Sequence, residues 1–261
     1  MGDDSMTGTG RSVVVTGAES GIGAACAVAF GEAGDRVAVF YHNDTSLAQA
    51  SADAVTAAGG KAVIVQCSVD DEGSVDRAFG QVEAAFGAAD VLVNSAGINM
   101  SGVKVRDMTA ATWQRMIATD LSGAFFVSRR FLTGRKAASG GSIIHISSIH
   151  AEVVRAGGAD YDAAKGGLTR LVQTLAIEEA GAGIRVNAIE PGMILTPMNE
   201  RALTDDAYRQ SLESSIPMKR AGQPIEVARL ARWLASDEAA YITGATIVID
   251  GGLSLVLGVG A

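Results

Sequence analysis

The chain is poor in cysteine and proline and contains no long apolar run. Cys26 and Cys67 are its two cysteines, and they lack metal-site spacing, so we expect two reduced core thiols and a cytoplasmic location. No stretch reaches the roughly 18 apolar residues of a membrane span, and no charged-then-apolar leader opens the chain. The net charge of −8 disfavours nucleic acid as a partner, because phosphates need a basic surface.

The 4 prolines contrast with 32 glycines, which follow no collagen-like period and indicate many tight turns. Residues 1–10 are small and polar, so we expect a disordered N-terminal segment. Residues 11–261 show no internal repeat or linker and are long enough for one domain with a sizeable core.

Short apolar runs alternate with helix-type patterns along this domain. The runs expected as strands are 13–15, 36–41, 61–66, 90–94, 142–147, 185–189 and 246–250. The segments expected as helices are 24–33, 46–58, 72–86, 112–133 and 161–180. Apolar strands separated by helices are typical of a parallel sheet buried on both faces. The pattern therefore predicts an α/β, single-domain, Rossmann-like doubly wound parallel seven-stranded sheet with helices on both faces.

The segment 193–216 interrupts this alternation, with a helix expected around 205–212. Long excursions after a strand often cover a binding site, so we expect a substrate lid here.

Residues 16–23 form a glycine-rich turn between the first strand and the first helix. Glycines let the backbone approach a pyrophosphate, and a helix N-terminus offers free N–H groups. A single turn of this kind is a weak signal. Four further segments, 41–42, 94–97, 147–148 and 191–192, also follow strands, so all five should meet at the carboxyl edge of the sheet.

Tyr161 and Lys165 are four residues apart, so a helix places both on one face. An ammonium about 4 Å from a phenol is worth roughly 4 kcal/mol at an effective dielectric of about 20, which favours the phenolate and general acid–base chemistry. The spacing alone is common on solvated helices. Its place at the carboxyl edge, with Ser148 delivered by a strand end, makes a proton-transfer site the stronger interpretation.

The ordered motifs resemble those of the short-chain dehydrogenase/reductase family. They are Thr-Gly-x-x-x-Gly-Ile-Gly (16–23), Asn-Ser-Ala-Gly (94–97), Ile-Ser-Ser (146–148), Tyr-x-x-x-Lys (161–165), Arg-Val-Asn-x-x-x-Pro-Gly (185–192) and Ile-Thr-Gly…Asp-Gly-Gly (242–252). Segments 142–167 and 216–252 are most similar to glucose 1-dehydrogenase-like sugar dehydrogenases of bacteria.

The resemblance implies an NAD(P)-dependent oxidoreductase acting on a secondary alcohol or ketone. Tyr161 would be the acid–base group, Lys165 would support it and hold the nicotinamide ribose, and Ser148 would bind the substrate oxygen. The cofactor-binding residues implied are Gly17, Ser20, Gly21, Ile22, Gly23, Tyr41, His42, Ser68, Val69, Asn94, Ala96, Gly97, Tyr161, Lys165, Pro191, Gly192, Ile194 and Thr196. No metal is expected. The resemblance also implies a homotetramer, with a dimer as the alternative.

Three positions depart from the family pattern. Asp120 stands where a catalytic asparagine is usual, and we expect it still to serve in catalysis because the surrounding pattern is intact, although its charge would raise the pKa of Lys165. Tyr41 stands where an aspartate would select NAD, and His42 stands where an arginine would select NADP. The choice between NAD and NADP therefore stays open. Ser68, which precedes Val69, stands where the family usually has an aspartate. This change should tune the affinity of the protein for the adenine of the cofactor.

His150 and Asn99 are the expected substrate contacts beyond Ser148 and Tyr161. The polar segment 150–155 favours a sugar or polyol, but Asn99 stands where sugar dehydrogenases tend to carry an acid, which puts glucose itself in doubt. Apolar residues between 193 and 198 would instead favour a 3-oxoacyl thioester. A catalytically impaired dinucleotide-binding or redox-sensing protein is the alternative from another class, with Asp120 as its support. His145 lies within a strand and is expected to be a satisfied core residue.

Overall fold

The computed structural model describes residues 10–135 and 140–256. The disordered segment expected at 1–10 therefore lies, apart from Gly10, outside the described residues, as does the C-terminal end of the domain from residue 257.

The described residues contain a sheet of seven parallel strands, which confirms the predicted fold class. Its strand order is β3-β2-β1-β4-β5-β6-β7. The strands are β1 Ser12–Thr16, β2 Arg36–Tyr41, β3 Lys61–Gln66, β4 Val91–Asn94, β5 Gly141–Ile146, β6 Ile184–Pro191 and β7 Thr246–Ile249. The predicted strand ends agree within two residues. The order reverses at β1, which pairs with both β2 and β4, and ligands of doubly wound sheets bind beside such a reversal.

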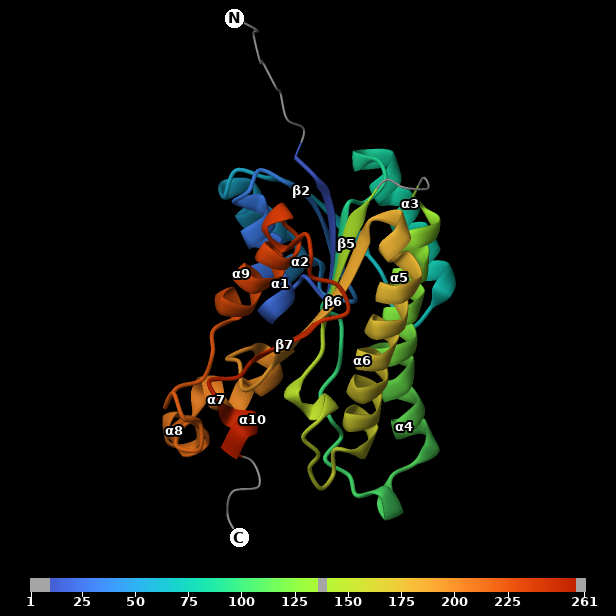
Figure 1. Cartoon of the computed structure of the whole chain (residues 1–261). Coiled ribbons are helices and arrows are strands. Elements are labelled where there is room, and N and C mark those ends of the chain that lie inside the picture. The colour runs from blue at the N-terminus through green and yellow to red at the C-terminus, as the bar shows by residue number, and fades with distance from the viewer. Residues whose placement is uncertain (1–9, 136–139, 257–261) are drawn as a thin grey trace, which may run out of the picture.

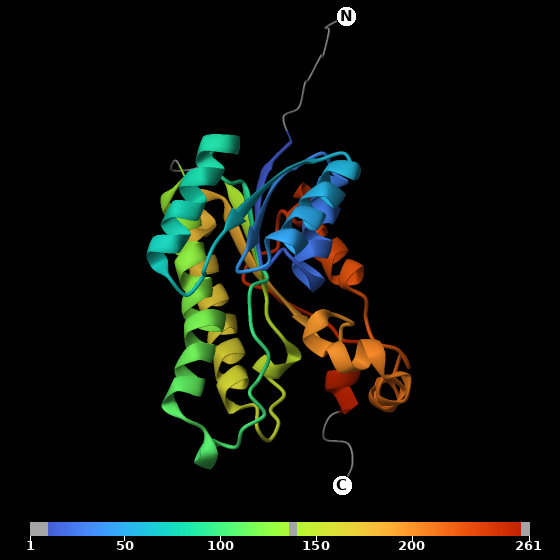
Figure 2. The same cartoon turned by 180° about the vertical axis from the view of Figure 1, so that it is seen from behind.

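Helices cover both faces of the sheet. They are α1 Gly21–Gly31, α2 Thr45–Ala57, α3 Glu72–Phe86, α4 Ala110–Met116, α5 Gly123–Thr133, α6 Ala159–Glu179, α7 Glu200–Thr204, α8 Asp206–Glu213, α9 Pro224–Leu234 and α10 Leu253–Val256. One layer holds α1, α2 and α9, and the opposite layer holds α3, α5 and α6, with α4 extending beyond the sheet edge (Figure 1). The view from behind shows the same two layers (Figure 2).

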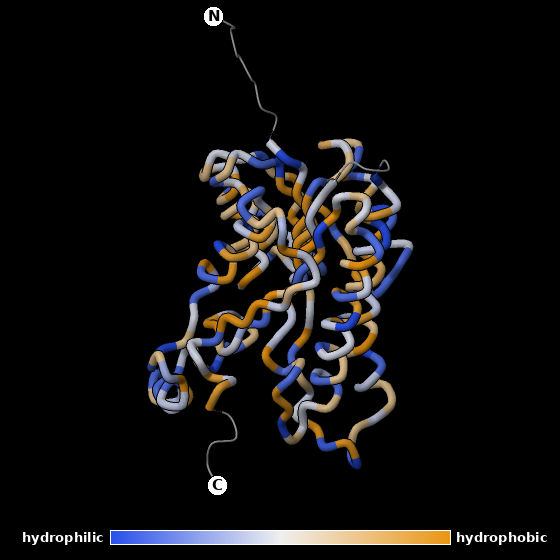
Figure 3. The backbone as a smooth tube through the Cα atoms, in the orientation of Figure 1, coloured by the Kyte–Doolittle hydropathy of each residue, from blue (hydrophilic) through white to orange (hydrophobic). Residues whose placement is uncertain are grey.

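The strand residues alternate between two cores, as a pleated strand requires. Val13 and Val15 of β1 belong to the core beneath α1 and α9, whereas Val14 belongs to the core beneath α3, α5 and α6. All three valines are fully buried. Because both faces are apolar, many hydrophobic segments lie at the centre of the molecule, as Figure 3 shows.

The helix predicted over 112–133 is not regular. Between α4 and α5 the chain forms a π-helical segment, Ile117–Ser122, which includes Asp120. A π-helical turn holds an extra residue and commonly occurs at functional sites. Spacing alone could not reveal it, because the apolar pattern continues on both sides.

The segment 193–216, expected as a substrate lid and called the lid segment below, contains two short helices, α7 and α8, where one helix was expected. Asp205 separates them, and its side chain accepts a hydrogen bond from the N–H of Tyr208 at the start of α8. The acid thus ends one helix and caps the next.

His145 in β5 lies at the centre of a buried hydrogen-bond chain. Thr16 donates to Asn94 Oδ1 at 2.8 Å, and Asn94 Nδ2 lies 3.3 Å from His145 Nδ1. Ser128 Oγ donates to the carbonyl of Ala124 at 2.7 Å and lies 3.2 Å from His145 Nε2. These partners assign the proton to Nε2, so His145 is neutral and satisfied. The hydrogen bonds join β1, β4 and β5 to α5.

Stability should therefore depend on pH through His145. Its burial, and secondarily the charge of Lys165, lower the pKa of His145 to about 3. A histidine in the unfolded chain titrates at about 6.5, so below that pH the unfolded state binds a proton that the folded state does not bind. The contribution of His145 to the free energy of unfolding is therefore complete above about pH 6.5 and is lost as the pH falls. Between about pH 6 and pH 4, we expect the unfolding free energy to decline by about 1.4 kcal/mol per pH unit more in the parent than in His145→Gln.

Chemical denaturation at several pH values measures that difference, and His42→Gln, which alters an exposed histidine, serves as the control. Equal pH slopes for the parent and His145→Gln would show that His145 is not the group responsible.

Candidate active site

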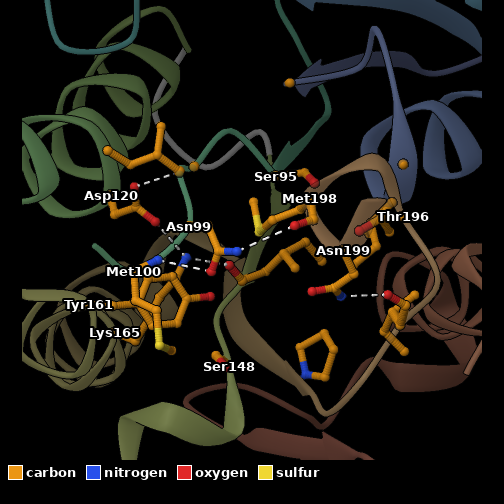
Figure 4. A pocket seen from close by; sticks show the side chains of 18 of the residues that line it. Ser95, Asn99, Met100, Asp120, Ser148, Tyr161, Lys165, Thr196, Met198 and Asn199 are labelled. Carbon is orange, nitrogen blue, oxygen red and sulfur yellow. Dashed lines mark hydrogen bonds and ion pairs between the residues drawn. The ribbon is translucent and has the colours of Figure 1, made fainter. Parts of the chain in front are cut away.

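A cavity of about 800 Å³ opens at the carboxyl edge of the sheet. Its walls come from segments that follow β1, β2, β3, β4, β5 and β6, together with the lid segment, as the topology predicts. Figure 4 shows Ser148, Tyr161 and Lys165 on one side of this space and Thr196, Met198 and Asn199 of the lid segment on the other.

Ser148, Tyr161 and Lys165 all line the cavity. Tyr161 and Lys165 lie one turn apart on α6 and are 9% and 4% exposed. The Lys165 ammonium lies 5.3 Å from the centre of the Tyr161 ring. Ser148 follows β5, and its Oγ accepts a hydrogen bond from the N–H of His150 at 3.2 Å. A phenol, an ammonium and a hydroxyl thus face one space, which suits proton transfer to or from a ligand oxygen.

Asp120 contacts Lys165 directly. Asp120 Oδ2 lies 3.1 Å from Lys165 Nζ, and Asp120 Oδ1 accepts the N–H of Ile98 at 2.9 Å. Lys165 Nζ also donates to the carbonyl of Ile146 at 3.3 Å. Burial alone would lower the pKa of Lys165, but the Asp120 carboxylate and then Tyr161 outweigh it, so the pKa is raised. The lysine is therefore held as an ammonium.

Glycine is required beside this pair and in the glycine-rich turn. A Cβ on Gly97 would stand 2.7 Å from Asp120 Oδ2, so any side chain there would displace the carboxylate. Gly17 has a φ of +60°, and a Cβ on it would approach the Ala96 backbone to 2.9 Å. Gly21 has a φ of +55°, which favours glycine. The turn therefore exposes backbone in the manner of a phosphate-binding loop.

The cavity beside this turn fits a dinucleotide. Ser20 precedes α1 and makes no side-chain cap, so the N–H groups at the start of α1 remain available to a phosphate. Glu19 Oε2 is buried and has no hydrogen-bond partner among the described residues. Such an acceptor needs a donor, and a ribose hydroxyl supplies one. Thr196 lies opposite Gly21, 3.3 Å from where a Cβ would be, so the turn and the lid segment enclose the cavity from two sides.

The structure brings most of the predicted residues to this cavity. Those that line it are Gly17, Ser20, Gly21, Ile22, His42, Ser68, Val69, Ala96, Gly97, Asn99, Asp120, Ser148, His150, Tyr161, Lys165, Pro191, Gly192, Ile194 and Thr196.

Gly23, Tyr41 and Asn94 were predicted to bind the cofactor but lie behind the cavity wall. A Cβ on Gly23 would stand 2.1 Å from the carbonyl oxygen of Gly17, so this glycine closes the turn. The Tyr41 ring packs in the core, and its hydroxyl accepts a hydrogen bond from Thr45. Asn94 serves the His145 chain.

Two predicted ligand contacts also bond within the protein. Asn99 Nδ2 donates to the carbonyl of Met198 at 3.3 Å, which joins the β4 end to the lid segment (Figure 4). Ser68 Oγ donates to Asp70 Oδ1 at 2.6 Å, so its hydroxyl already has an acceptor.

Several cavity residues were not predicted, among them Glu19, Met100 and Met198. Glu19 had a signal, because it lies within the glycine-rich turn between Gly17 and Gly21. Met198 had one too, because it belongs to the apolar residues between 193 and 198 that would favour an acyl chain. Met100 had none.

Over residues 10–135 and 140–256, no helix has the length and apolar character needed to cross a bilayer. The same residues contain no group of three or more histidine, cysteine or acidic side chains arranged to hold a metal ion.

Comparisons with known proteins agree with this geometry. The sequence model of the family described as "Enoyl-(Acyl carrier protein) reductase" matches residues 17–254. The chain is 42% identical over 252 residues to 3beta-hydroxysteroid dehydrogenase 1 of Eggerthella lenta, covering 95% of each chain. It is 38% identical over 248 residues to glucose 1-dehydrogenase 2 of Bacillus subtilis, covering 95% of this chain and 96% of the relative.

Among solved structures, a short-chain dehydrogenase/reductase from Serratia marcescens superposes with a TM-score of 0.88 at 32% identity, covering 94% of this chain and 98% of that one. The chain therefore belongs to the short-chain dehydrogenase/reductase family and is an oxidoreductase acting on alcohol and ketone groups.

Proposed function

We propose that this chain transfers a hydride between NAD or NADP and a secondary alcohol or ketone, with Tyr161 as the acid–base group. The observation that carries the proposal is the convergence of Tyr161, Lys165 and Ser148 on a cavity that also contains the glycine-rich turn. When bound, the nicotinamide would supply the site for hydride transfer.

The chain's own residues would manage the proton. Ser148 Oγ would hold the substrate oxygen within reach of the Tyr161 hydroxyl, which would take the proton during oxidation and return it during reduction. Lys165 would stabilise the phenolate through its positive charge, which Asp120 maintains. Gly17, Ser20 and Gly21 would hold the pyrophosphate.

We propose a sugar or polyol as the first substrate class. His150 Nδ1 lies 2.7 Å from the Val153 carbonyl, so a neutral ring donates there and leaves Nε2 as an acceptor for a ligand hydroxyl. Arg155, which also lines the cavity, adds a donor.

A second candidate is an alcohol or ketone with an apolar body, such as a hydroxysteroid or a 3-oxoacyl thioester. It is favoured by apolar cavity residues from the lid segment and its surroundings: Met100, Met193, Met198, Leu212, Ile216 and Leu253.

A substrate panel tests the function. Sugars, steroids and oxoacyl thioesters are offered with each nicotinamide cofactor, and absorbance of the reduced ring is followed. We expect turnover by the parent, and a loss of at least about a hundredfold in Tyr161→Phe, because removal of an acid–base group costs that much. NADH affinity, measured by fluorescence, should change by less than about threefold, because the ring above Lys165 remains.

The control is Tyr241→Phe, which removes the same hydroxyl from a fully exposed tyrosine and should leave turnover unchanged. Full activity in Tyr161→Phe would exclude Tyr161 as the acid–base group.

Asp120→Asn should keep or raise turnover. Asparagine can still accept the N–H of Ile98, and Lys165 keeps its hydrogen bond to the Ile146 carbonyl. The substitution removes the negative charge that offsets the effect of the Lys165 ammonium on Tyr161. We expect the acidic limb of the pH profile for alcohol oxidation to shift by roughly one unit toward lower pH.

The profile is compared with that of Asp107→Asn, an exposed acid, and melting temperatures confirm folding. A loss of turnover above about tenfold would contradict this account of Asp120.

We also propose a homotetramer. Two separate surfaces carry exposed apolar side chains: Phe125 and Ile177 on α5 and α6 are 41% and 82% exposed, and Val248 and Leu255 near the C-terminus are 48% and 81% exposed. Two distinct self-complementary patches generate a tetramer with dihedral symmetry.

Light scattering should give four times the 26.6 kDa chain mass. Ile177→Glu should halve it, whereas Ile177→Leu should not. A monomeric parent would exclude the proposal.

A further inference from the structure

The dinucleotide half of the cavity has an acidic group where the adenosine ribose would lie. In doubly wound folds, a carboxylate at the end of β2 accepts a hydrogen bond from the ribose 2′-hydroxyl and selects NAD. Here β2 ends at Tyr41, whose ring is in the core and whose hydroxyl is bonded to Thr45. The end of β2 therefore supplies no carboxylate of its own.

Glu19 supplies one from the neighbouring turn. Glu19 Oε1 accepts the N–H of His42 at 3.2 Å, which brings the carboxylate to the end of β2. The carbonyl of His42 accepts a hydrogen bond from Gln66 Nε2 of β3 at 3.0 Å, so the backbone at this position is held from both sides. Glu19 Oε2 is the buried oxygen without a partner.

The described residues around this place include no lysine or arginine to receive a 2′-phosphate, and the imidazole of His42 is their one basic side chain. Neither the turn 17–23, the end of β2 at 40–44, nor the end of β3 at 66–70 contains lysine or arginine. Asp70 lines the same cavity and adds a second acid. The cationic lysine and arginine side chains that do line it are Arg115 of α4, Arg155 before α6, and Lys165, which is paired with Asp120.

We propose that Glu19 selects NAD over NADP, with Oε2 accepting the hydrogen bond of the ribose 2′-hydroxyl. This inference rests on the proposed function and resolves the cofactor choice that Tyr41 and His42 leave open. Even in a water-like dielectric, a carboxylate and a phosphate dianion about 5 Å apart repel enough for a loss of about tenfold in affinity. The 2′-hydroxyl of NAD finds a hydrogen-bond acceptor at the same place, so Glu19 favours the binding of NAD and disfavours that of NADP.

Binding rather than turnover provides the test. NADH and NADPH are titrated against the parent, Glu19→Gln, Glu19→Lys and the control Glu32→Gln, with nicotinamide fluorescence as the signal. We expect the parent to bind NADH at least about tenfold more tightly than NADPH, Glu19→Gln to bind them within about threefold of each other, and Glu19→Lys to prefer NADPH.

Glu32→Gln makes the same charge change beyond the opposite end of α1, where the side chain is 49% exposed, and should retain the parent's ratio. Displacement of NADH by 5′-AMP or by adenosine 2′,5′-bisphosphate confines the comparison to the ribose.

The outcomes separate the two proposals. If the folded parent binds neither NADH nor NADPH, the proposed function fails and this inference fails with it. If both bind but the parent does not prefer NADH, or if the ratio is the same in Glu19→Gln as in the parent, only the inference is overturned. Circular dichroism of each variant establishes folding, and Glu19→Gln, the conservative change, decides the matter if Glu19→Lys does not fold.

Discussion

The active site depends on one buried ion pair, Asp120 with Lys165. Their side chains are 1% and 5% exposed, and charges so deeply buried are tolerated only when they are paired and hydrogen-bonded. Asp120 reaches the lysine from the π-helical segment between α4 and α5, and its second oxygen binds the N–H of Ile98. The π-helical segment thus sets where the Asp120 carboxylate meets Lys165, which lies on α6 one turn from Tyr161.

Much of the fold was predictable because strands buried on both faces are continuous apolar runs. The sequence 13–15 shows this, as does the glycine-rich turn directly after it. The pairing of Tyr161 with Lys165 was also predictable, since a helix fixes the relation between residues four apart. These features depend on contacts close in sequence, and the structure reproduces them within one to three residues at most element ends.

What sequence reasoning missed depends on contacts far apart in the chain. Tyr41 occupies the position of a cofactor ligand but turns into the core, and the carboxylate at that place comes from Glu19, 23 residues earlier than His42. The family resemblance led us to expect the effect of Asp120 on Lys165, but the π-helical segment that brings the two side chains together leaves no mark on the apolar period. Hydrophobic patterns and residue propensities describe neighbours along the chain, so they do not predict contacts between residues far apart in the sequence.

The segment after β4 links the lid segment to the catalytic charge. Gly97 packs against the Asp120 carboxylate, Ile98 donates to it, and Asn99 donates to the carbonyl of Met198. Three consecutive residues thus touch both the counter-ion of Lys165 and the backbone of the lid segment. A shift of these residues would alter both contacts at once, so any movement of segment 193–216 would be felt at the counter-ion of Lys165.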